Sequence, residues 1–206
     1  TGWALLFHPD LLHGFPLERR IKEYSFFDYR VNEALHMTAE EHDTLVPLMR
    51  QMRDELGKKA DELQNRILVG YIELMLNFCQ RFYNRQFLTR KIENSDILVR
   101  FDRLLRDYFD EKFQLKLGLP TVQYCADRLC MSANYFGDVI KKTTGETASS
   151  HIRRFVIRLA KNGLAAGESV SQVSDRLGFE YPQHFSRMFR KMEGLTPSEY
   201  CRNLRS

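Results

Sequence analysis

The chain has 206 residues, 43% hydrophobic and 12% aromatic, which is enough for one or two domains with real cores. No apolar run approaches the roughly 20 residues of a membrane span, so no membrane partner is expected. The net charge of +4 is uneven, because residues 121–206 hold 13 Lys/Arg against 8 Asp/Glu while residues 1–120 hold 18 against 19. This asymmetry suggests a polyanionic partner for the C-terminal part.

The residue types that carry chemistry point away from catalysis. Cys79, Cys125, Cys130 and Cys201 form no C-x-x-C pair, and no histidine lies at a metal-ligand spacing from them. We therefore expect buried free thiols in a reducing cytoplasm. No carboxylate pair, nucleophile–histidine arrangement or glycine-rich phosphate loop stands out, so the sequence predicts neither an enzyme nor a bound metal or cofactor.

The first part of the chain predicts a helical hairpin. The apolar run 3–7 is typical of the last strand of a domain, and since the chain does not begin with Met we expect that domain to precede it in a longer protein. A capping box at Thr38 starts a helix that Gly57 ends, and a second helix follows over about 59–83. The wide apolar stripe of this hairpin, residues 39–83, favours a homodimer; the alternative is that the preceding domain covers it.

A linker is predicted at residues 86–96, where the helical periodicity breaks. Ser95 or Asp96 would cap the next helix, and residues 113–120 are predicted to form a loop. The predicted division of the chain is therefore residues 1–85, the linker 86–96 and residues 97–206.

Beyond Pro120 the sequence repeats itself. Four positions recur 48 residues later: Val122, Cys125, Ala126 and Leu129 are matched by Val170, Val173, Ser174 and Leu177. Four more recur 49 residues later: Phe136, Val139, Ile140 and Gly145 are matched by Phe185, Met188, Phe189 and Gly194. Each copy predicts a short helix, a tight turn and a second helix, which is the helix-turn-helix plan.

One long helix is predicted between the two copies, over about residues 147–166. In the second copy, the stretch from Pro182 to Gly194 predicts a short helix with an apolar back and a basic, amide-bearing front. Two recognition helices held on one side of a protein can enter successive major grooves, about 34 Å apart. The predicted fold is all-α: a helical hairpin followed by a double helix-turn-helix domain joined by a long connecting helix.

Five side chains on the second recognition helix are candidate DNA contacts. Gln183 could bond adenine, and Arg187 could bond guanine O6 and N7 in bidentate fashion. His184 suits a base or phosphate contact better than a metal, because no partner ligand is near. Arg190 and Lys191 lie a turn further on and suit phosphates. For each residue the alternative is a solvated surface side chain.

Five more candidates lie on the first recognition helix. Asn134 could pair with adenine, and Tyr135 could stack on a base or bond a phosphate. Asp138 could accept from cytosine N4, but an intramolecular salt bridge suits it better because it opposes the phosphates. Lys141 and Lys142 share the face of Asn134 and Asp138. We expect this unit to anchor the protein more than to read bases.

A motif extends through both copies. It reads A-x-x-L-x-x-S-x-x-Y-F from Ala126, K-K-x-x-G from Lys141, and G-F-x₅-F-S-R-x-F-R-K-x-x-G-x-T-P-S-x-Y from Gly178. Over about residues 97–204 the chain resembles the DNA-binding domain of the AraC/XylS family of bacterial transcription regulators. It departs from that family where Ser174 replaces a usual Ala and Gly163 a common Leu, the latter suggesting a softer connecting helix.

The resemblance implies a role for each part of the chain. Residues 1–85 would be the C-terminal remainder of a sensor or dimerisation region, and residues 97–206 a DNA-binding domain. The partners implied are double-stranded promoter DNA, RNA polymerase and a small-molecule effector bound through a preceding domain. The function implied is a sequence-specific transcription regulator. The alternative is a protein-interaction or dimerisation module, built on the hairpin, with weak DNA binding.

Overall fold

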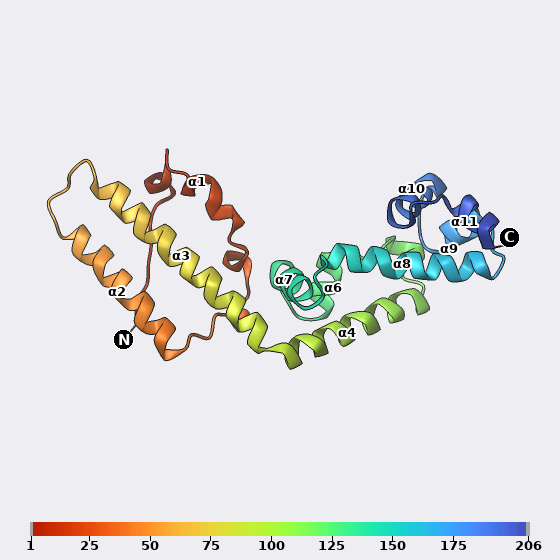
Figure 1. Cartoon of the computed structure of the whole chain (residues 1–206), viewed down its shortest axis with the longest axis horizontal. Coiled ribbons are helices and arrows are strands. Elements are labelled where there is room, and N and C mark those ends of the chain that lie inside the picture. The colour runs from red at the N-terminus through yellow and green to blue at the C-terminus, as the bar shows by residue number, and fades with distance from the viewer. Residues whose placement is uncertain (1, 205–206) are drawn as a thin grey trace. The chain divides into compact units, whose positions relative to one another are not determined.

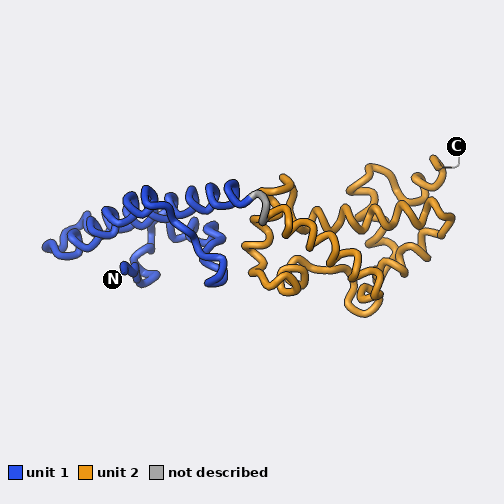
Figure 2. The backbone as a smooth tube through the Cα atoms, turned by 90° about the horizontal axis from the view of Figure 1, so that it is seen from below, with its two compact units in different colours: residues 1–90 blue, residues 91–206 orange. Residues whose placement is uncertain are grey.

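In the computed structural model, residues 2–204 are described, apart from the side chains of residues 91–93. The fold is all-α as predicted, and no strand occurs in that range. The chain divides into two compact units, residues 1–90 and 91–206 (Figure 2). The division falls at Arg90, inside the predicted linker.

The first unit contains a hairpin of two long helices and a series of short helical turns before it (Figure 1). Its elements are η1 (Pro9–Leu12), α1 (Leu17–Arg20), η2 (Ile21–Glu23), η3 (Ser25–Asp28), η4 (Val31–Glu33), α2 (Ala39–Leu56) and α3 (Gln64–Thr89). The core lies where the short turns and α2 cover one side of α3, and its buried members are Leu12, Leu17, Tyr24, Met52, Leu68, Val69, Ile72 and Leu76.

The predicted start of α2 is confirmed. Thr38 accepts from the Glu41 backbone N–H at 3.2 Å, and the Glu41 carboxylate accepts from the Thr38 backbone N–H at 2.9 Å. The same carboxylate binds Arg85 of α3 at 2.6 Å, so the capping box also ties the two helices together. The hydrogen bonds from Arg85 and Thr38 hold the pKa of Glu41 below its ordinary value, against the effect of burial.

Two expectations for the first unit are corrected. Residues 2–8 have no regular secondary structure, because a strand needs a neighbour to complete its ladder and the described part of the chain offers none. Helix α3 begins at Gln64 rather than near residue 59, since the Asp61 carboxylate accepts from the backbone N–H groups of Leu63 and Gln64. Helix α3 also extends six residues beyond the predicted end at Tyr83.

The stretch 86–96 is helical except at Arg90, so the expectation of an irregular segment there is wrong. Gln86 interrupts the apolar pattern of the sequence, because this buried position holds a polar side chain. Its amide accepts from His36 N–H at 2.8 Å and donates to the Ala34 carbonyl. Its apolar neighbour Phe87 is buried beside it. Helix α4 then begins at Lys91, so neither Ser95 nor Asp96 caps it.

The second unit holds the two predicted helix-turn-helix copies. Its elements are α4 (Lys91–Asp110), α5 (Gln114–Leu117), α6 (Val122–Arg128), α7 (Ala133–Thr144), α8 (Ala148–Ala165), α9 (Val170–Arg176), α10 (Pro182–Glu193) and α11 (Pro197–Leu204). The predicted loop at 113–120 therefore contains α5, and α11 is an element that the sequence reading did not assign.

Side-chain caps and glycines set the limits of these helices. Ser132 accepts from the Tyr135 N–H at the start of α7, and Thr147 does the same for α8 at the Ser150 N–H. Gly145 and Gly194 adopt left-handed conformations, with φ of 78° and 76°, and stop α7 and α10.

The connecting helix α8 is continuous over 18 residues and contacts α7, α9, α10 and α11. Buried His151 of α8 bonds Asp102 of α4, with 2.8 Å between Nε2 and Oδ1. At Gly163 an added Cβ would lie 2.3 Å from the Arg176 guanidinium, which is held by Glu168 at 2.9 Å. The absence of a side chain at Gly163 thus makes room for an ion pair between Arg176 of α9 and Glu168 of the loop that joins α8 to α9.

The cysteines are free, but they are not all buried. Cys125 lies in the core, where burial raises the pKa of its thiol to about 12. Cys79 and Cys201 are half-buried, and burial raises the pKa of the Cys79 thiol as well. Cys130 is exposed at the turn between α6 and α7, which corrects the expectation of four buried thiols.

Candidate nucleic-acid interface

The ten candidate contacts occupy five pairs of matched positions on α7 and α10, each 49 residues apart. The pairs are Asn134 and Gln183, Tyr135 and His184, Asp138 and Arg187, Lys141 and Arg190, and Lys142 and Lys191. The repeat therefore brings the candidates to equivalent positions, and the environments of the two helices can be compared residue by residue.

The back of α10 is a closed aromatic core. Phe185 and Phe189 are fully buried, with ring centroids 5.8 Å apart in an edge-on arrangement. Phe179 from the turn lies 5.4 Å from Phe185, and Tyr200 from α11 lies 5.5 Å from Phe189. With its back fixed on both sides, α10 presents its front in a defined orientation.

The front of α10 carries amide, imidazole and basic groups. Gln183, His184, Arg187, Arg190 and Lys191 are all exposed, and their three- and four-residue spacings put them along one face. Across the described residues, Arg187 and Lys191 have no ion pair within the chain. Arg190 lies near Glu199, whose pKa is lowered chiefly by the hydrogen bonds that Thr196 donates to it.

One exposed residue on this front was not predicted. Tyr181 precedes Pro182 at the start of α10, and its ring meets the His184 ring edge-on with centroids 5.5 Å apart. The tyrosine is 46% exposed. It therefore packs against the imidazole and adds an aromatic surface beside it. Its position before a helix-opening proline was the available sequence signal.

The front of α7 differs from that of α10. Asn134, Lys141 and Lys142 are exposed, as DNA contacts require. Asp138 is half-buried and takes part in a polar interaction within the chain. Tyr135 is only 8% exposed, so its ring is not available to stack on a base, and a phosphate contact is the role that stays predicted for it.

Helix α7 is held in place by α4 as well as by α6 and α8. Phe101 of α4 meets the buried ring of Phe136 edge-on, with centroids 4.9 Å apart. Arg154 of the connecting helix α8 forms an ion pair with Glu146 and contacts Nδ1 of the His151 ring. On α7 itself, the positive charge comes from Lys141 and Lys142.

Among the helices of residues 2–204, none combines the length and the apolar composition that a membrane span requires. In that range no three His, Cys, Asp or Glu side chains come together in a metal-binding group.

Comparison with known proteins agrees with this geometry. A helix-turn-helix domain family matches residues 125–203, which contain the second copy and all but the first three residues of the first. The uncharacterized transcriptional regulatory protein YesN of Bacillus subtilis is 31% identical over 117 residues, covering 54% of this chain and 30% of its own. The transcriptional activator RhaS of an Enterobacter species is 27% identical over 172 residues, covering 83% of this chain and 56% of its own.

The chain thus spans less than two thirds of the length of either relative. Among solved structures, the C-terminal domain of AraT, a response regulator from Geobacillus stearothermophilus, covers 50% of this chain and 84% of its own. It has 24% identity and a TM-score of 0.42. The family match, taken with the two copies in register, identifies residues 125–203 as a helix-turn-helix domain of the AraC type.

Proposed function

We propose that the chain is the DNA-binding part of an AraC-type transcription regulator that recognises specific promoter sequences. The observation that carries this proposal is the front of α10, where an amide, an imidazole and three basic side chains are exposed over a closed aromatic back. Such a helix suits the major groove, because each base pair presents a distinct donor and acceptor pattern there.

The second part of the proposal is that α7 and α10 enter successive major grooves. The 18 residues of α8 make it about 27 Å long. Helix α7 lies at one end of α8 and α10 near the other (Figure 1), where Lys161 of α8 pairs with Glu193 of α10. The length of α8 approaches the distance of about 34 Å between successive major grooves on one face of DNA.

Each exposed side chain is given a role by its chemistry. Arg187 would bond guanine in bidentate fashion, and Gln183 and Asn134 would each pair with adenine. His184, packed against Tyr181, would contact an adjacent base or phosphate. The lysines of α7 and the last basic residues of α10 would meet phosphates, which position the protein without specifying sequence.

The remaining partners follow from the resemblance and extend the proposal. A regulator of this type would act in the cytoplasm, contact RNA polymerase at the promoter and respond to a small molecule through a domain preceding this chain. It would form a homodimer through residues 39–83. Three large apolar side chains at the start and on the outer side of α3 support the dimer: Leu63, which directly precedes the helix, and Ile67 and Leu74 within it are 57%, 39% and 43% exposed.

Selection of binding sites from random duplex DNA tests the proposal. We expect an enriched sequence with two short conserved blocks about one helical turn apart. Affinity for that sequence should fall steeply with salt, with log K decreasing by about 0.9 per phosphate contact for each unit of log salt concentration. Binding that shows no sequence preference at any salt concentration would contradict specific recognition.

The second candidate function is a protein-interaction module, and the exposed apolar side chains of α3 favour it. It predicts no DNA binding even at low salt, together with self-association that sequence changes in α10 leave unaltered. Gel shifts and sedimentation on the same sample therefore separate the two functions.

A further inference from the structure

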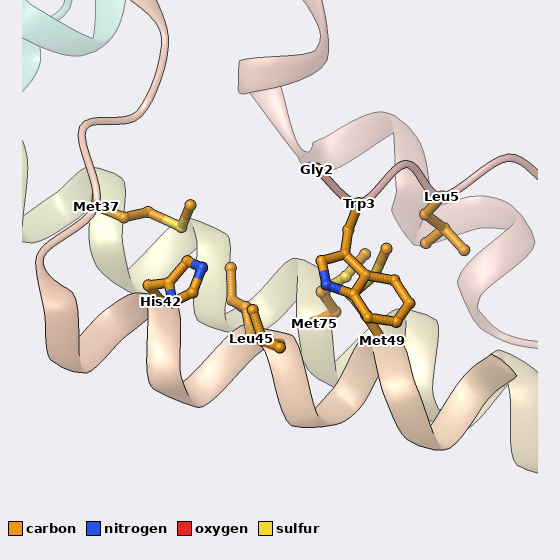
Figure 3. Close-up of a pocket in the computed structure, with 9 residues that line it drawn as sticks. Gly2, Trp3, Leu5, Met37, His42, Leu45, Met49 and Met75 are labelled. Atoms are coloured by element: carbon orange, nitrogen blue, oxygen red, sulfur yellow. The ribbon is translucent and has the colours of Figure 1, made fainter. Parts of the chain in front are cut away.

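An apolar cavity lies in the first unit, between the start of the chain and the helical hairpin (Figure 3). Its volume is about 430 Å³, within the range of about 300–1,000 Å³ that small-molecule sites occupy. Its lining residues are Gly2, Trp3, Leu5, Met37, His42, Leu45, Val46, Met49 and Met75. The proposed DNA interface does not involve this cavity, because its lining residues all belong to the first unit.

The floor of the cavity is continuous with the core of the unit. Met49 of α2 and Met75 of α3 are half-buried and pack against the core cluster, as does Leu5. Methionine side chains are flexible and polarizable, so such a floor can adapt to an apolar or aromatic molecule. The opposite edge is open to solvent, because Trp3 is 45% and Met37 46% exposed.

Polar and cationic groups stand at two places on this apolar surface. His42 is the one ionisable side chain among the lining residues, and its ring lies beside Met37 (Figure 3). Its Nδ1 has only a long contact of 3.5 Å to Asp43. At the other place, the Arg53 guanidinium lies 5.5 Å from the centre of the Trp3 ring, which lines the cavity, and packs against that ring.

We propose that this cavity binds a small molecule with an aromatic or branched apolar body and one anionic or hydrogen-bond-accepting group. The volume and the adaptable thioether floor select the apolar body, and His42 receives the polar group. Binding would tie residues 2–5 to α2 and α3. The inference concerns the first unit alone and stands or falls independently of DNA binding.

Two related dyes test this ligand class directly on the whole chain. 1-Anilinonaphthalene-8-sulfonate has an aromatic body and one sulfonate, and N-phenyl-1-naphthylamine has the same body without the charge. Trp3 is the only tryptophan in the sequence, so energy transfer from it reports a dye bound nearby. We expect both dyes to bind saturably, to quench Trp3 emission and to raise the unfolding temperature.

Two changes distinguish the cavity from other apolar surface. Val46→Phe fills it and should weaken both dyes about tenfold or more, whereas Leu88→Phe adds the same ring at an exposed α3 position outside the lining and should change neither. His42→Ala should weaken the sulfonate dye about threefold and leave the uncharged dye unaffected. Leu45→Phe serves as a second filling variant if Val46→Phe fails to fold, judged by circular dichroism.

Equal dye binding in the wild type and in a folded filling variant would overturn the proposal. So would Trp3 emission that does not respond to saturating dye. Loss of dye binding as protein concentration rises, with a dimer appearing in sedimentation, would overturn it too, since a second copy would then be the occupant of the cavity.

Discussion

The two helix-turn-helix units close their turns with the same backbone hydrogen bond and differ in the side chains around it. Met131 N–H donates to the Ala126 carbonyl at 2.9 Å in the first, and Phe179 N–H to the Ser174 carbonyl at 3.1 Å in the second. The left-handed residue of the turn is Cys130 in the first unit, with φ of 60°, and Gly178 in the second, with φ of 80°. A shared backbone geometry therefore tolerates different residues wherever the surroundings differ.

The surroundings explain the difference at the turn. The left-handed conformation of Cys130 is energetically unfavourable for a residue with a side chain. Because Cys130 is exposed, that side chain clashes with no neighbouring element. At Gly178 an added Cβ would lie 2.3 Å from the backbone oxygen of Gln114, because α5 packs against the end of α9. Gln114 also donates from its side chain to the Arg176 carbonyl at 3.0 Å. The second turn is thus wedged against α5.

The recognition helices differ in the same way. Helix α10 exposes His184 where α7 buries Tyr135, and it exposes Arg187 where α7 has the engaged Asp138. The second unit therefore has the better equipped reading surface, and the first contributes mainly Asn134 and its two lysines. Under the proposed function, the first copy would mainly anchor the protein and the second would read bases.

The largest expected effect is at the second turn. Gly178→Ala should lower the free energy of unfolding by about 3 kcal/mol, since both the positive φ and the contact with the Gln114 backbone oppose a side chain. Cys130→Ala at the matched position should change it by less than about 0.5 kcal/mol. Urea unfolding monitored by circular dichroism measures both variants. Similar losses at the two turns would show that the wedge of α5 is unimportant.

The next effect concerns DNA. Arg187→Ala should cost about 1–3 kcal/mol at the selected site and relax base preference at one position. Asp138→Asn at the matched position should leave the affinity unchanged or raise it, because a negative charge near phosphates is removed. Fluorescence anisotropy on the selected and on random duplexes provides the measurement. An equal loss for Arg187→Ala on both duplexes would remove its reading role.

A smaller effect is expected in the cores, where Ala126 is matched by Ser174. Both are fully buried, and the Ser174 hydroxyl has no hydrogen-bond partner. Ser174→Ala should therefore raise the free energy of unfolding by about 1 kcal/mol, and Ala126→Ser should lower it by about 1–3 kcal/mol. Thermal and urea unfolding of the two variants decide the point. A less stable Ser174→Ala protein would mean that the hydroxyl is satisfied after all.

The smallest expected effects lie at the starts of the recognition helices. Ser132 caps α7 with its side chain, whereas Tyr181 at the same position makes no side-chain cap for α10. Ser132→Ala should lower the free energy of unfolding by about 1 kcal/mol, and Tyr181→Ser should raise it by about 0.5 kcal/mol. If Tyr181→Ser unfolds at a lower urea concentration than the wild type, the missing side-chain cap of α10 does not limit the stability of the protein.

Much of the second unit could be predicted because its signals are local. The paired apolar positions, the caps at Ser132 and Thr147 and the stops at Gly145 and Gly194 each act within a few residues. Their recurrence after 48 or 49 positions then shows one plan used twice. The ten candidate contacts were found from the same spacing, and their roles on DNA stay predictions.

Other features depend on partners distant in the sequence, and these the sequence could not reveal. Helix α3 continues past residue 86 with polar Gln86 buried in it, and that side chain is satisfied by His36 and Ala34, some fifty residues earlier. The burial of Tyr135, the role of α5 against Gly178 and the cavity beside Trp3 likewise exist only once separate elements pack. Periodicity and capping chemistry therefore determined the helices, while tertiary contacts decided which residues they expose.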